Sequence, residues 1–325
     1  MEKKQFISFI SKAIKFLLVF FLLDVSLGAL AKYLFFKQSS GKFARITYSL
    51  EKVNSDILIF GSSHANRHYI PAIFEKKLNL SCYNVGVQGQ RILFHSVIEE
   101  IIVNRAKPKI IILNIDEDWL FKSQEAYDRL SVLHPYYSEY TNIIKPILLL
   151  KSKVDYLILN LNSYKYNSTI VHILKYFLQP QYVQKGYNPL YGKLLPTDVN
   201  LQLILKQNPI KESELIDVNF VNAFNRFIKT ATTNNIKIFF VLSPKIDGPQ
   251  IKNESSEMIK EIISKNNLPL IDFSSDKNFT RKYELFNDVG HLNNDGATLL
   301  SSLLSDSIYN KINADNIFHS SHKGH

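Results

Sequence analysis

The sequence predicts an α/β protein, a three-layer α/β/α sandwich built on a parallel sheet. Three largely apolar runs support this, because strands buried on both faces lack polar alternation. They cover residues 56–60, 109–115 and 236–242. Segments with helical periodicity separate the runs, and alternating strands and helices favour parallel pairing with right-handed crossovers.

The remaining elements follow in order along the chain. Two further short strands are expected at 81–85 and 268–273, each bounded by turn-forming residues. Pro71 stands near the start of the first helix, a position that tolerates proline. The predicted helices cover residues 69–78, 92–106, 215–234, 250–266 and 293–310.

Residues 120–214 interrupt this rhythm and are expected to form a mostly helical insertion within a main domain covering 56–312. In an enzyme such an insertion commonly shapes a substrate cleft. Structural padding and a membrane-proximal docking surface remain the alternatives. Residues 313–325 are expected to form a flexible tail. Disorder explains that tail's three histidines better than a metal site does.

The N-terminal residues 1–36 predict a cytoplasmic tip and a transmembrane helix over 13–36. Four lysines precede the apolar run and place the N-terminus in the cytoplasm, with the rest of the chain outside: Lys3, Lys4, Lys12 and Lys15. Asp24 is costly at that depth. A cleaved signal peptide is the alternative, but the apolar run resumes at Tyr33, which favours an uncleaved anchor. Residues 37–55 are expected to be a linker or a first helix.

Composition excludes several classes of function. The 325 residues carry a net charge of +10, but lysine is scattered and no basic arm appears, so no nucleic-acid partner is expected. The single Cys82 excludes intramolecular disulfides and cysteine-based metal clusters. No phosphate loop or dinucleotide fingerprint occurs. We therefore expect neither cofactor nor metal.

Two short segments suggest nucleophilic chemistry. Ser62, Ser63 and His64 follow Gly61 where a strand turns into a helix, so a serine there lies beside backbone N–H groups. The alternative is that a serine only caps the helix. Asp288 and His291 lie three apart near the C-terminus, a spacing that lets a carboxylate orient an imidazole toward a serine.

With these residues the chain resembles the SGNH/GDSL hydrolase superfamily, whose fold is flavodoxin-like. It is most similar to a membrane-anchored bacterial branch associated with acylation of cell-envelope polymers. Gly61–Ser63 matches the first block of the family, Asn84–Gly89 the second, and Asp288 with His291 the last. The third block departs, because Asn114–Asp118 replaces the usual Gly-x-Asn-Asp.

The resemblance implies that Ser63 is the nucleophile, His291 the base and Asp288 its orienter. Backbone N–H groups of Ser63 and Gly89 would form the oxyanion hole, with Gly86 as the alternative to Gly89. The altered third block puts its side-chain donor in doubt, since an ionised carboxylate only accepts. The possible substrate contacts are Asn114, His64 and Arg67.

The implied function is a membrane-anchored, extracytoplasmic esterase or O-acyltransferase in the bacterial cytoplasmic membrane. It would act on a cell-surface polysaccharide or a related acylated substrate, with a membrane acyltransferase as a possible partner. The alternative is a catalytically impaired glycan-binding or assembly module of the cell envelope.

Overall fold

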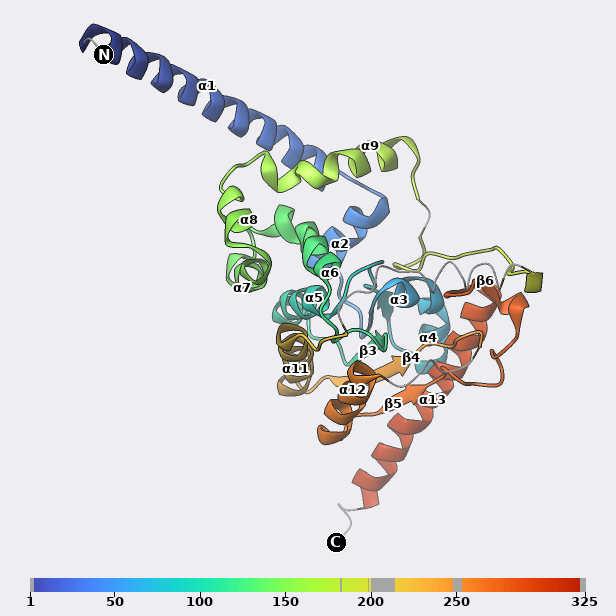
Figure 1. Ribbon diagram of the computed structural model, residues 1–325. Coiled ribbons are helices and arrows are strands. Elements are labelled where there is room, and N and C mark those ends of the chain that lie inside the picture. The colour runs from blue at the N-terminus through green and yellow to red at the C-terminus, as the bar shows by residue number, and fades with distance from the viewer. Residues whose placement is uncertain (1–2, 182, 198, 200–213, 248–252, 322–325) are drawn as a thin grey trace. The chain divides into compact units, whose positions relative to one another are not determined.

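The computed structural model describes residues 3–181, 183–197, 199, 214–247 and 253–321 (Figure 1). The chain divides into two compact units. Unit 1 comprises Met1–Ala44 and Leu130–Gln181, and unit 2 comprises Arg45–Arg129 and Tyr182–His325.

Unit 2 is built on a five-stranded sheet in the order β2-β1-β3-β4-β5, and every neighbouring pair is parallel. This confirms the predicted parallel sheet. The strands are β1 (Ile57–Phe60), β2 (Cys82–Asn84), β3 (Ile110–Ile115), β4 (Lys237–Leu242) and β5 (Leu270–Asp272). All six residues of β3 are buried, which explains the largely apolar run.

Helices cover both faces of the sheet and give the three predicted layers (Figure 1). On one face Ile57, Ile112 and Val241 pack in a core cluster that includes Leu300 and Leu304. On the other face Phe60 and Phe240 each contact a phenylalanine of α11, at ring-centroid distances of 5.3 and 5.5 Å. The helices of unit 2 are α3 (Ser63–His68), α4 (Pro71–Leu78), α5 (Ile92–Arg105), α6 (Gln124–Asp128), α11 (Val218–Thr233), α12 (Glu254–Lys265) and α13 (Asn294–Ser321).

Three local features differ from the sequence-based expectation. The helix that opens at Ser63 ends at His68, and the chain is extended at Tyr69 and Ile70, within the predicted 69–78 helix, before Pro71 starts α4. A short 3-10 turn η3 (Tyr283–Leu285) precedes a two-stranded hairpin of β6 (Phe286–Asp288) and β7 (His291–Leu292).

The final helix is the third difference. Residues 313–321, expected in a flexible tail, belong to α13. No glycine or proline occurs between Ala297 and Lys323, so the sequence offers no strong stop. Residues 322–325 lie outside the described part of the chain.

Unit 1 contains the N-terminal helix α1 (Lys3–Phe36) and most of the helical insertion. In the described part of the chain, α1 is the helix long and apolar enough to cross a membrane. The 37–55 segment holds α2 (Gly41–Glu51). The insertion forms η1 (Arg129–Tyr136), α7 (Thr141–Lys151), α8 (Lys153–Ile158), η2 (Tyr164–Thr169) and α9 (Ile170–Leu178). Its residues 182, 198 and 200–213 lie outside the description.

Candidate active site

The turn after β1 positions Ser63 at the start of α3. Gly61 adopts φ +137°, and a Cβ there would lie 2.6 Å from the carbonyl oxygen of Asn114, so only glycine fits. Ser62 does not cap the helix. Its hydroxyl instead donates to Asp116 at 2.7 Å. Ser63 is partly exposed and leads the helix.

The β6–β7 turn brings Asp288 and His291 to Ser63. The Nε2 atom of His291 lies 2.9 Å from the Ser63 hydroxyl, and its Nδ1 lies 3.0 and 3.1 Å from the two carboxylate oxygens of Asp288. The Gly290 N–H also donates to Asp288, at 2.8 Å. Because the carboxylate only accepts, Nδ1 carries a proton and Nε2 accepts from Ser63. The contacts predicted between these three residues are therefore present.

Asp288 is suited to remain ionised. Burial alone would raise the pKa of its carboxyl, but the hydrogen bond and charge of His291 and the Gly290 N–H outweigh burial and lower the pKa. A carboxylate that stays charged holds the imidazole in one tautomer and stabilises the imidazolium that forms when the ring takes a proton.

The backbone donors near Ser63 favour Gly89 over Gly86. The Gly86 N–H donates to the Asn84 side chain at 3.0 Å, so it is already engaged. Within the described part of the chain, the N–H groups of Ser63 and Gly89 have no hydrogen-bond acceptor. Gly89 adopts φ +70°, and a Cβ there would overlap the guanidinium of Arg129.

The third block supplies no side-chain donor to an oxyanion. Asn114 is fully buried within β3, where its amide donates to the Val241 carbonyl at 3.0 Å and to the Ser243 hydroxyl at 3.1 Å. It ties β3 to β4 and is not the substrate contact expected from the sequence. The physical reason is its place inside the strand, one residue before the strand ends.

Asp116 follows β3 and acts as an acceptor for three neighbours. It accepts from the hydroxyl of Ser62, the indole N–H of Trp119 at 3.0 Å and Nδ1 of His64 at 2.6 Å. Burial would raise the pKa of this carboxyl, but the charge and hydrogen bond of His64 and the other two donors lower it. An ionised carboxylate in this position cannot donate to an oxyanion.

His64 is engaged at both ring nitrogens and does not point at a substrate. Its Nε2 lies 2.8 Å from the Gly290 carbonyl oxygen, which can only accept, so Nε2 carries a proton. Its Nδ1 faces the ionised Asp116 and carries the other. The ring is therefore an imidazolium that links Asp116 to the turn carrying His291, and both of its N–H groups are already bonded.

His68, four residues after His64 on α3, also bonds to the β6–β7 segment that carries His291. The Leu292 N–H donates to its Nε2 at 3.0 Å, and its Nδ1 lies 3.2 Å from the Ser243 hydroxyl. Burial, together with the charges of His64, His291 and Arg67, holds the pKa of His68 well below its usual value, so the ring is neutral. The helix that begins with Ser63 thus binds the backbone on both sides of His291.

Neither His68 nor Asp116 is among the site residues predicted from the sequence. Two signals could have identified them. His64 and His68 are four residues apart on the helix led by Ser63, so they share a face. Asp116 directly follows a buried parallel strand, at the edge where such sheets bind ligands.

Arg67 is a cation of α3 beside Asp288. With the Gln88 side-chain amide turned so that its oxygen faces the guanidinium, Arg67 Nε lies 2.7 Å from that oxygen. Burial lowers the pKa of Arg67, and the charge of Asp288 opposes this shift. The side chain is partly exposed, and its role as a substrate contact stays a prediction.

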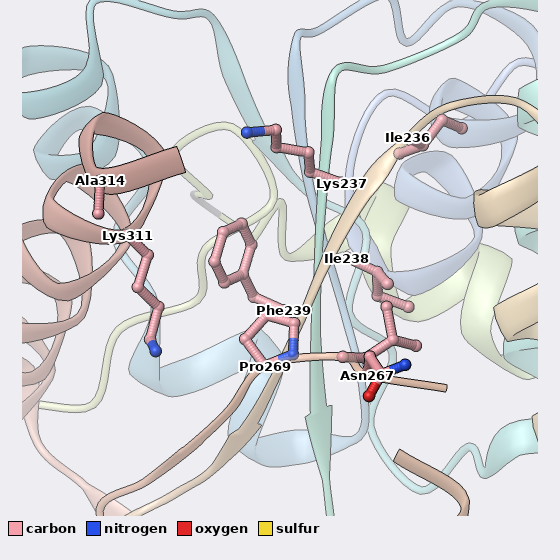
Figure 2. Close-up of a pocket in the computed structure, with 9 residues that line it drawn as sticks. Ile236, Lys237, Ile238, Phe239, Asn267, Pro269, Lys311 and Ala314 are labelled. Atoms are coloured by element: carbon pink, nitrogen blue, oxygen red, sulfur yellow. The ribbon is translucent and has the colours of Figure 1, made fainter. Parts of the chain in front are cut away.

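A cavity of about 520 Å³ lies at the opposite ends of the strands (Figure 2). Ile236 to Phe239 at the start of β4, Pro269 before β5, and Lys311 on α13 line it. None of its lining residues belongs to the Ser63 site, so it does not serve as the cleft for that chemistry. The described residues contain no cluster of metal-ligating side chains.

A scan against protein-family models finds no match, and a search of curated proteins finds none either. Solved structures do match. A protein from Desulfitobacterium hafniense assigned as a lipolytic protein of the G-D-S-L family is 11% identical, with a TM-score of 0.37, over 77% of this chain and 98% of that one. A Bacteroides fragilis protein assigned as an acylhydrolase is 13% identical, with a TM-score of 0.37, over 82% and 94%.

A Bacteroides thetaiotaomicron protein described as a GDSL-like lipase is 11% identical, with a TM-score of 0.34, over 78% of this chain and 88% of that one. These three solved proteins are among those to which the chain is similar. The membrane-anchored branch stays a prediction.

Proposed function

We propose that the protein is a serine-dependent ester hydrolase or O-acyltransferase of the SGNH type. One observation carries the proposal: the continuous relay from Asp288 through His291 to the Ser63 hydroxyl, with contacts of 3.0 and 2.9 Å. A serine hydroxyl is a weak nucleophile until an adjacent base accepts its proton, and this relay provides that base.

In the proposed reaction His291 Nε2 takes the Ser63 proton while Oγ attacks the ester carbonyl. The N–H groups of Ser63 and Gly89 stabilise the oxyanion. Collapse of the intermediate breaks the bond to the leaving alkoxide, which receives the proton from His291. Water or an acceptor hydroxyl, deprotonated by the same ring, then releases the acyl group from Ser63.

His64 and His68 are positioning residues in this scheme. Both hold the backbone of the turn that carries His291, at Gly290 and Leu292 respectively. A misplacement of about 1 Å can cost a reaction about 10²-fold, so fixing this turn matters for the rate.

The oxyanion hole has two backbone donors and lacks the family's side-chain donor. One such donor is typically worth about 10²–10³ in rate. The missing donor slows hydrolysis and acyl transfer alike, because both pass through an oxyanion at Ser63. Since α1 would hold the protein at the membrane, we propose a glycan or other envelope polymer as substrate or acceptor, with a membrane acyltransferase as the candidate donor partner.

The proposed location is the bacterial cytoplasmic membrane, crossed once by α1, with unit 2 outside the cell. The apolar surface of α1 and the lysines before it support this orientation. A reporter that is active only outside the cytoplasm should be active when it is fused after His325. Activity of a reporter that works only in the cytoplasm would contradict the orientation.

Labelling with a fluorophosphonate probe tests the chemistry. Wild-type protein should be labelled, Ser63→Ala should not, and Ser302→Ala, which removes an exposed serine on α13, should behave as wild type. Labelling of Ser63→Ala would reject the nucleophile. Absence of labelling in correctly folded wild-type protein would favour the glycan-binding module, the second candidate suggested by the reduced oxyanion hole.

A further inference from the structure

The surroundings of α1 change at Asp24. Every side chain from Phe16 to Leu23 is exposed, whereas Asp24 and Gly28 are buried within unit 1. The Asp24 carboxylate accepts hydrogen bonds from the backbone N–H groups of Asn162 at 2.8 Å and Ser163 at 3.0 Å, and from the Ser163 hydroxyl at 2.6 Å. The insertion therefore reaches α1 at this residue.

The length of the apolar run places this contact inside the bilayer. Lys15 closes the cytoplasmic side, and the stretch from Phe16 to Leu23 rises only about 12 Å. A hydrocarbon core is about 30 Å thick, so the span has to continue past Asp24 to Phe36. Asp24 then lies near the middle of the bilayer, and the rest of α1, as far as Phe36, crosses the outer leaflet.

The same hydrogen bonds explain how a carboxylate is tolerated at that depth. Polar groups within a bilayer must be satisfied by the protein, because no water is available to them. Asn162 and Ser163 supply four donors to Asp24, two from the backbone and two from side chains. The contact is therefore suited to hold the insertion against α1 in an apolar medium.

Helix α9 presents a continuous apolar face away from unit 1. It packs beside α1 (Figure 1), and on its inner side Ile173 is buried and the His172 ring lies 5.7 Å from Phe43. Val171 is 76% exposed and Phe177 70%. The exposed apolar residues share one face at helical spacing: Ile170, Val171, Leu174, Phe177 and Leu178.

The insertion exposes further apolar residues on α8 and carries exposed lysines. Val154 and Leu157 of α8 are also exposed, at 64% and 61%. Exposed lysines accompany the apolar residues in all three helices of the insertion: Lys145, Lys153 and Lys175. Exposed apolar residues accompanied by lysines are typical of helices that lie in the interface of a membrane.

We propose that the apolar face of α9 lies in the outer leaflet of the bilayer that α1 spans. Its occupant is lipid, at the boundary between acyl chains and headgroups. The insertion is then a second membrane contact beside the anchor. This inference rests on the proposed anchor and not on the proposed ester chemistry.

Depth-dependent quenching of single-cysteine variants tests the proposal. The native cysteine is removed by Cys82→Ala, and an environment-sensitive fluorophore is attached at Leu174→Cys or Phe177→Cys in the full chain, reconstituted in phosphatidylcholine–phosphatidylglycerol vesicles. Phe20→Cys on α1 is the reference for the span. Lys265→Cys, exposed on α12, is the reference for water. Nitroxide-labelled lipid and aqueous iodide are the two quenchers.

We expect the α9 probes to be quenched by the lipid nitroxide, as the Phe20→Cys probe is, and to be shielded at least several-fold from iodide relative to Lys265→Cys. If the Phe20→Cys probe is quenched by lipid while both α9 probes are quenched by iodide, the proposal is rejected and the anchor stands. If all probes are quenched by iodide alone, the anchor is rejected together with the proposal. Neither result bears on Ser63.

Discussion

Asp116 and Glu99 are two carboxyl groups of unit 2, the first partly exposed and the second fully buried, and their surroundings are opposite. Asp116 accepts hydrogen bonds from Ser62, His64 and Trp119. Glu99, on α5, is fully buried, and neither of its carboxyl oxygens has a hydrogen-bond partner among the described residues. The pKa of Asp116 is lowered, whereas burial, with Glu100 adding to it and Arg226 opposing it, raises the pKa of Glu99 well above its usual value.

The difference shows where polar groups in this fold are organised for a site. At the carboxyl edge of the sheet, Asp116 bonds His64, and His64 and His68 hold the turn that carries His291. Among the described residues, the polar side chains of α5 make no hydrogen bond to that turn. There the His95 ring stacks on the Trp119 ring at a centroid distance of 5.7 Å. Burial lowers the pKa of His95 to about 3, so the ring is neutral.

Breaking the network at Asp116 should give the largest effect. Asp116→Asn removes the charge that faces the His64 imidazolium and turns one acceptor oxygen into a donor facing other donors. We expect a loss of about 3 kcal/mol in the free energy of unfolding, measured by urea denaturation, and slower labelling of Ser63. Unchanged stability would show that the paired state of Asp116 is not the dominant one.

Two substitutions of His64 should separate its two contacts. Gln can still donate near the position of Nε2, toward Gly290, whereas Asn can donate only near that of Nδ1, toward Asp116. We expect His64→Asn to slow probe labelling by about 10–100-fold, as loss of supporting contacts often does, and His64→Gln to retain most of the rate.

Labelling should be measured against probe concentration for both His64 variants, to separate probe binding from reaction. A positioning role predicts a lower limiting rate with probe affinity largely kept. Equal defects in both variants would indicate that the charge of His64, and not its hold on Gly290, matters.

The sheet and the Ser63, Asp288 and His291 contact could be predicted because each rests on local signals. Buried parallel strands have a clear apolar pattern. A glycine-serine turn directly after such a strand fixes the serine at the end of the strand, where the next helix begins. The parallel order then brings the C-terminal turn to the same edge. The contacts of Asn114 and His64 could not be predicted in this way.

Those contacts depend on register and packing between distant segments. Asn114 bonds Val241 because β3 and β4 pair in one register, and a shift by one residue would turn its side chain to the other face. His64 bonds Gly290 because the β6–β7 turn folds over α3. Neither contact can be predicted from the spacing of residues along the sequence.

Replacing Glu99 should have the opposite sign from replacing Asp116. Glu99→Met removes a buried, unpartnered carboxyl while keeping a side chain of similar length. We expect the free energy of unfolding to rise by about 1 kcal/mol, with Ser63 labelling unchanged. A loss of stability would show that a hydrogen-bond partner stabilises the Glu99 carboxyl in the folded protein.

The contribution of Glu99 to the free energy of unfolding should change with pH. This is the smallest expected effect, but its sign is well defined. A carboxyl whose pKa is raised by folding contributes stability below its unfolded pKa, about 4.3, and loses that contribution as pH rises through the folded value. Asp116 and Asp288, whose pKa values are lowered, contribute in the opposite sense, and their contribution to stability is lost as pH falls.

Glu99→Gln isolates the contribution of Glu99, because Asp116 and Asp288 are unchanged in this variant. The stability of wild type minus that of Glu99→Gln, from urea titrations between pH 4.5 and 8, should therefore fall by about 1 kcal/mol as pH rises. A difference that stays flat would mean that Glu99 titrates alike in the folded and unfolded chain, and a rising difference would place it with Asp116.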